Sequence, residues 1–145
     1  MKKSLSFLAF MLITISIWAQ APQKMSYQAV IRNNLGALVA NQGIGMQISI
    51  LQGSASGTAV YVEKQFPHTN ANGLVSLEIN GDSSIIVSGT FSSINWANGP
   101  YYIKTQTDPT GAINYTILGT SQLISVPYAL YAANGGGTTY TAGTG

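Results

Sequence analysis

Residues 44–50 read Ile-Gly-Met-Gln-Ile-Ser-Ile, and their large apolar side chains stand at every second position: Ile44, Met46, Ile48 and Ile50. Successive side chains of a β-strand point to opposite faces of its sheet, so this spacing places all four on one face. Small or polar residues occupy the positions between them. The stretch therefore predicts a β-strand with one buried face.

Similar short runs, rich in Val, Ile, Tyr and Thr, recur along the chain between clusters of Gly, Asn, Pro and Ser. Regular spacing of this kind is typical of sandwiches and barrels. The other expected strands are Met25–Arg32, Ala59–Phe66, Leu74–Ile79, Tyr101–Thr107, Ile113–Leu118 and Gln122–Val126. The predicted fold is therefore all-β, an antiparallel β-sandwich of about seven strands.

Two other regions lack the strand pattern. Residues 83–100 are less regular, and Phe91, Ile94 and Trp96 are expected to close one end of the core. A short helical turn is expected over residues 127–133, because Pro127 is a favourable helix start and Gly135 follows the run. Residues 134–145 are rich in Gly and Thr, which predicts a flexible linker that begins a truncated stalk.

The first residues have the order of a secretory signal peptide. Lys2 and Lys3 precede an uncharged, mostly apolar stretch over residues 5–18, which is shorter than the roughly 20 residues of a membrane-spanning helix. Cleavage after Ala19 would make Gln20 the first mature residue, whereas cleavage after Ala21 would leave a proline there. The expected organisation is a signal peptide at 1–19, a β-sandwich domain at 20–133 and a linker at 134–145. The mature protein is expected to be secreted and to have no membrane span.

Removing the signal peptide changes the charge of the protein. The whole chain has six Lys and Arg against four Asp and Glu, and two of the six are Lys2 and Lys3. The mature chain is therefore formally neutral. Nucleic-acid binding needs a clustered basic face, and four scattered cations do not provide one.

The residues needed for catalysis or for a metal site are scarce. His68 is the single histidine and the chain contains no cysteine, which excludes Cys–His catalysis and the usual zinc sites. Glu63 and Glu78 alternate with apolar residues, so both are expected on solvated strand faces. We therefore expect no catalytic residues, no cofactor and no metal, and we do not expect an enzyme.

One group of aromatic residues suggests an alternative function. Trp96, Tyr101 and Tyr102 lie close to Asn95 and Asn98 in the sequence. Exposed aromatic rings beside amides stack on sugars, which would make the domain a carbohydrate-binding module. The competing interpretation is that Trp96 and one tyrosine cap the hydrophobic core, as aromatic residues commonly do.

Four segments carry a resemblance to a known group of proteins: Ala21–Asn33, Thr69–Ser76, Asn98–Lys104 and Ser125–Ala132. Together they resemble the N-terminal module of exported Bacteroidota surface proteins. In that group the module precedes tail-fibre-like stalks, collagen-like repeats or domains with a type IX secretion sorting signal. A looser likeness, through Gly36, Gly43, Ile50 and the Asn72-Gly73 turn, is to transthyretin-like (carboxypeptidase-regulatory) sandwiches, which share their architecture with immunoglobulin-like domains.

The resemblance implies a non-catalytic structural or interaction module of a cell-surface fibre or adhesin-like protein. Its expected partners are other copies of the full-length chain, joined as a trimer through a downstream stalk, together with a surface glycan or protein.

Overall fold

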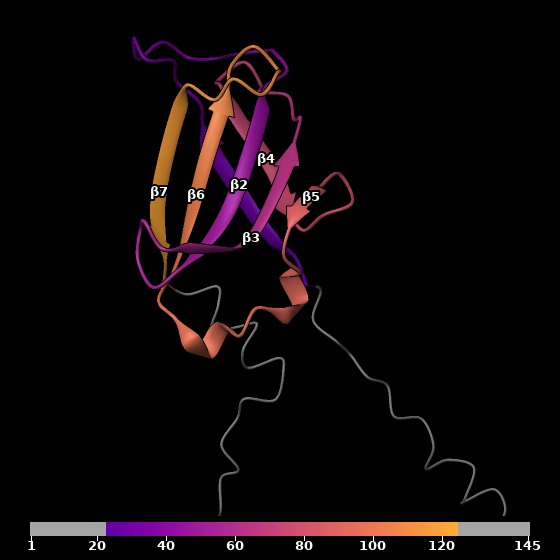
Figure 1. Cartoon of the computed structure of the whole chain (residues 1–145). Helices are drawn as coiled ribbons and strands as arrows, with labels where there is room; N and C mark the ends of the chain where they lie inside the picture. The colour runs from indigo at the N-terminus through magenta and orange to yellow at the C-terminus, as the bar shows by residue number, and fades with distance from the viewer. Residues whose placement is uncertain (1–22, 125–145) are drawn as a thin grey trace, which may run out of the picture.

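In the computed structural model, which describes residues 23–124, the chain forms two antiparallel β-sheets. The larger sheet has five strands in the order β5-β3-β2-β6-β7, and the smaller sheet pairs β1 with β4. Figure 1 shows the larger sheet in front and the smaller one crossing behind it. The strands are β1 (Met25–Val30), β2 (Gly45–Gln52), β3 (Thr58–Gln65), β4 (Leu74–Ile79), β5 (Ile85–Ser88), β6 (Tyr101–Asp108) and β7 (Ile117–Leu123). The all-β prediction is therefore confirmed, with seven strands in this part of the chain.

The residues that predicted the first strand form the centre of the larger sheet. Within β2, Met46, Ile48 and Ile50 are almost fully buried, and Ile44 just before it is equally buried. The opposite face of β2 also carries buried residues, Ser49 and Leu51. β3 pairs with one edge of β2 and β6 pairs with the other, so β2 lies at the centre of the larger sheet.

The last part of the domain differs from the sequence prediction. Residues 113–116 are not a strand, and β7 is one strand over residues 117–123 rather than parts of two. The cause is the Asp108 carboxyl group, which accepts hydrogen bonds from the Asn114 amide at 2.7 Å and the Thr110 amide at 2.8 Å. These bonds hold the chain in a loop after β6. The loop packs so closely on Gly45 that a Cβ there would lie 1.8 Å from the Ala112 oxygen.

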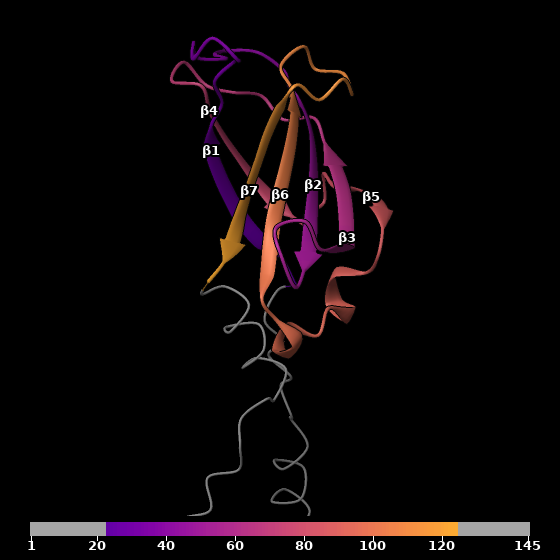
Figure 2. The ribbon, with the colours of Figure 1, turned by 60° about the vertical axis from the view of Figure 1, so that its left-hand side comes forward.

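The segment expected to be irregular contains the unpredicted strand β5 and two short 3₁₀ helices, η1 (Phe91–Ser93) and η2 (Trp96–Asn98). Both helices lie across the lower end of the sheets, as Figure 2 shows from a second side. Phe91, Ile94 and Trp96 are buried there. The prediction that these three residues close one end of the core is confirmed.

The two sheets differ in size, and this leaves one side of the larger sheet uncovered. Every residue of β5 is exposed, although β5 is hydrogen-bonded to β3. Ile86 pairs with the inward-facing Glu63 and so lies on the inner face of the sheet, yet its exposed fraction is 48%. The two-stranded sheet therefore does not extend as far as β5.

The expected signal peptide, the helical turn at 127–133 and the linker at 134–145 lie outside the described residues.

We expect Leu77→Ala to lower the free energy of unfolding by about 2–5 kcal/mol, because Leu77 faces the core and the variant leaves a cavity. Ser76→Ala is the matched control: its side chain faces solvent on the same strand, so its effect should stay within about 0.5 kcal/mol. Urea unfolding followed by fluorescence measures both values. Equal losses would mean that the register of β4 is shifted by one residue.

Candidate functional site

The aromatic residues considered for sugar binding are divided between the two faces of β6. Trp96 and Tyr101 are buried, with their ring centroids 5.1 Å apart in an edge-to-face arrangement. The Tyr101 hydroxyl donates a hydrogen bond to the Asn95 carbonyl at 2.7 Å, and burial raises the Tyr101 pKa. Tyr102 points to the opposite face and is partly exposed. The placement favours the core-capping interpretation, and the sugar contact remains a prediction.

These rings belong to a longer series of aromatic contacts inside the core. Phe91 lies between Tyr61 and Trp96, at centroid distances of 5.2 Å and 5.6 Å, both edge-to-face. The series therefore links β3 to η1, η2 and β6. Since Tyr61 must point inward to contact Phe91, every second residue of β3 after it must also point inward.

This constraint buries Glu63, which the sequence pattern had placed on a solvated face. Glu63 is fully buried and Gln65 is nearly so, whereas Glu78 is exposed as expected. The prediction for Glu63 is wrong because Val60, Val62 and Lys64 occupy the outer face of β3, so Glu63 points inward. The signal for the correct orientation was Tyr61, Glu63 and Gln65 at every second position, since such side chains can hydrogen-bond one another.

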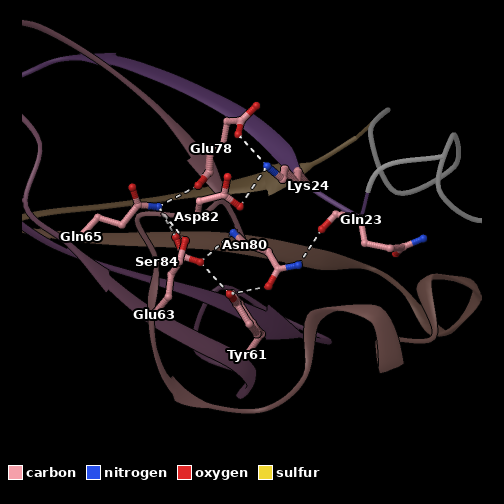
Figure 3. A network of polar contacts seen from close by, with 9 residues as sticks. All are labelled: Gln23, Lys24, Tyr61, Glu63, Gln65, Glu78, Asn80, Asp82 and Ser84. Atoms are coloured by element: carbon pink, nitrogen blue, oxygen red, sulfur yellow. Dashed lines mark hydrogen bonds and ion pairs between the residues drawn. The ribbon is translucent and has the colours of Figure 1, made fainter. Parts of the chain in front are cut away.

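The Glu63 carboxyl group accepts three hydrogen bonds, which Figure 3 shows in part. Its Oε2 atom accepts from the Tyr61 hydroxyl at 2.6 Å and from the Asn80 amide at 2.8 Å. Its Oε1 atom accepts from the Gln65 amide group at 2.6 Å. Burial, followed by the hydrogen bond to Glu63, strongly raises the Tyr61 pKa, so Tyr61 stays a hydrogen-bond donor. A buried polar group needs such partners, and here they come from β3 and from the turn directly after β4.

The same network fixes the end of β4 against β3. Gln65 Nε2 also donates to the Glu78 carbonyl at 2.8 Å and to the Ser84 hydroxyl at 3.1 Å. Asn80 adopts a left-handed φ of 57°, and its side chain donates to the Gln23 carbonyl at 2.7 Å. Asn tolerates this conformation better than most residues. The turn after β4 is thus held to β3 on one side and to the start of the domain on the other.

A groove of about 440 Å³ opens beside this network. Its walls are the edge of β4, the end of β3 and the turn between β4 and β5, and its lining includes Phe66, Ser76, Leu77, Glu78 and Asp82. We call it the β4 groove. Its volume is within the range of small-molecule sites.

Charged side chains mark one rim of the β4 groove. Lys24 Nζ lies 3.2 Å from Glu78 Oε2 and 3.5 Å from Asp82 Oδ1. The hydrogen bond to Glu78, then the charge of Asp82, raises the Lys24 pKa. The Asp82 side chain is 100% exposed, so it remains accessible to other cations.

Two further titratable groups, His68 and Asp108, lie apart from this network. His68 is exposed beside Gly43. The Asp108 carboxyl group accepts hydrogen bonds within the loop after β6, and those from Thr110 lower its pKa. Within residues 23–124, no three His, Cys, Asp or Glu side chains are grouped as metal ligands would be. No helix in this range is long and apolar enough to cross a membrane. Ala19 and Gln20, the expected cleavage site, lie outside it.

The comparisons with known proteins identify a family. The chain belongs to the family described as Domain of unknown function (DUF8740), which matches residues 26–122. This match begins in β1 and ends in β7, so it covers both sheets. No curated protein and no solved structure matches the chain.

The buried network gives a direct test of the corrected orientation of β3. We expect Glu63→Ala to cost about 2–4 kcal/mol of unfolding free energy, because it leaves the Asn80 amide without its acceptor and the Tyr61 hydroxyl with only the longer bond, of 3.3 Å, to the Asn80 side-chain oxygen. Glu78→Ala is the control, since it removes a largely exposed ion pair and should cost less than about 1 kcal/mol. Chemical denaturation compares the two variants. A loss at Glu63 no larger than at Glu78 would contradict the network.

Proposed function

We propose that this domain is the non-catalytic N-terminal structural and interaction module of a secreted, cell-surface fibre or adhesin-like protein. The module would act by contact with other proteins and by its place in an assembly. Its titratable groups support this proposal, since Glu63 and Asp108 are held by hydrogen bonds within the fold and Lys24 pairs with Glu78 and Asp82.

The observation that carries the proposal is the exposed apolar edge of the larger sheet. Ile85, Ile86 and Val87 follow one another along β5, with exposed fractions of 56%, 48% and 51%. Phe66, which follows β3, is 50% exposed. An uncovered apolar strand at a sheet edge is a common feature of surfaces that bind another chain.

The finer parts of the proposal rest on the sequence. We assign the two sheets to a transthyretin- or immunoglobulin-like sandwich, and the module to exported Bacteroidota surface proteins. The Gly/Thr-rich composition of residues 135–145 supports a stalk, through which copies of the full-length chain would form a trimer. A stalk of this kind would display several copies of the domain at once.

Export and assembly test the proposed function. When the protein is expressed in a bacterium that can export it, mass spectrometry of the extracellular or surface fraction should find Gln20 as the first residue. Light scattering should find residues 20–145 monomeric and a chain extended through the following region trimeric. Retention of the intact N-terminus inside the cell would contradict the proposal, and a stable trimer of residues 20–145 would contradict the stalk.

A further inference from the structure

The backbone of β4 has one edge paired with β1 and one edge that faces the β4 groove. The Ile31 amide donates to the Gly73 carbonyl at 2.8 Å, so Gly73 faces β1. In an antiparallel strand the direction of the backbone groups alternates from residue to residue. The backbone amide and carbonyl groups of Val75 and Leu77 therefore also face β1. Those of Leu74, Ser76 and Glu78 face away from it.

Some of the outward groups are satisfied within the domain. Leu74 exchanges hydrogen bonds with Asn70, whose amide donates to the Leu74 carbonyl at 3.0 Å. The Glu78 carbonyl accepts from Gln65 at 2.8 Å and from the Gly81 amide at 3.1 Å. Among the described residues, the Ser76 amide, the Ser76 carbonyl and the Glu78 amide have no such partner. Three main-chain groups are thus available at the β4 groove.

The uncovered part of the larger sheet lies next to these main-chain groups and could pack against an added strand. A strand placed beside β4 would lie under the part of the larger sheet that the smaller sheet leaves uncovered. It would then cover the exposed inner face at Ile86 and contact Phe66 in the groove wall. Burial of apolar surface would add to the main-chain hydrogen bonds, which is how strand-addition sites obtain affinity.

We propose that the β4 groove binds an extended peptide segment of a partner protein as a third strand of the β1–β4 sheet. This inference rests on the proposed function as an interaction module, and it names the partner's chemistry. The segment carries a basic side chain, because two carboxylates, Glu78 and Asp82, face a single ammonium group at the rim. Asp82 is the more exposed of the two and would receive that side chain.

The shape of the groove favours a single strand over a second copy of the domain. The β4–β5 turn, with Gly81 and Asp82, forms a wall beside the open edge. Figure 1 shows this turn projecting at the side of β5. A lone extended segment fits between this wall and β4, whereas the flat edge of another folded sheet would meet the wall first.

A labelled octapeptide of alternating threonine and valine, with one central lysine, serves as the probe. Fluorescence anisotropy should show saturable binding to the purified chain. Ser76→Pro removes the outward amide and leaves the bonds to β1 in place, so it should weaken binding about tenfold or more. Ser76→Ala keeps the amide and should bind as the unaltered chain does.

The charge at the rim of the β4 groove allows a second test, which does not require the Ser76→Pro variant to fold. Asp82→Lys should weaken binding of the lysine peptide and strengthen binding of the same peptide with a central glutamate. Asp82→Asn should weaken the lysine peptide without favouring the glutamate peptide. Because Asp82 is fully exposed, neither change should disturb folding.

Three results would overturn the inference: no binding of the probe, equal binding to Ser76→Pro and Ser76→Ala, or no change of peptide preference in Asp82→Lys. A dimer that forms in the unaltered chain but not in Ser76→Pro would also overturn it, since the occupant would then be a second copy. Failure of the peptide experiment leaves the export and assembly results intact, so it is distinguishable from failure of the proposed function.

Discussion

The hydrogen bonds of the buried Glu63 carboxyl group fix the position of β4, and much of the arrangement around the groove follows from that position. Glu63 lies in β3 of the larger sheet, but one of its donors is the Asn80 amide just after β4. Gln65 extends the connection by donating to the Glu78 carbonyl. Buried polar groups are costly unless all are paired, so this network specifies one position of the two sheets and disfavours the alternatives.

Within residues 23–124 the smaller sheet consists of β1 and β4 alone, with β4 fixed in this way. β1 and β4 cover the centre of the larger sheet, where Ile48 and Tyr61 are fully buried, and they stop short of β5. The outcome is an open edge, a groove and exposed apolar side chains on the same side of the domain. Such a side is unfavourable for an isolated protein and useful for one that works by contact, which agrees with the proposed interaction module.

Apolar residues at every second position predicted the well-paired strands. This pattern failed at β5, where the apolar residues are consecutive, and at Glu63, where a charged residue is buried. Ile44–Ile50 and Leu74–Ile79 alternate clearly, because in each the large apolar side chains at every second position face the core. β5 was missed because Ile85–Val87 is a run without alternation in a polar context. Glu63 was misplaced because charged residues are rarely buried, although its spacing from Tyr61 and Gln65 allows all three to share an inward face, and the contact of Tyr61 with Phe91 fixes that face. The β4 groove depends on outward backbone groups, which no side-chain pattern records.

Amide hydrogen exchange in the free chain tests the open edge of β4 most directly. We expect slow exchange at Val75 and Leu77, whose amides face β1, and fast exchange at Ser76 and Glu78, whose amides face the groove. Addition of the lysine peptide should slow the second pair without changing the first. Equally slow exchange at all four amides in the free chain would show that this edge of β4 is already paired, and would contradict an open edge.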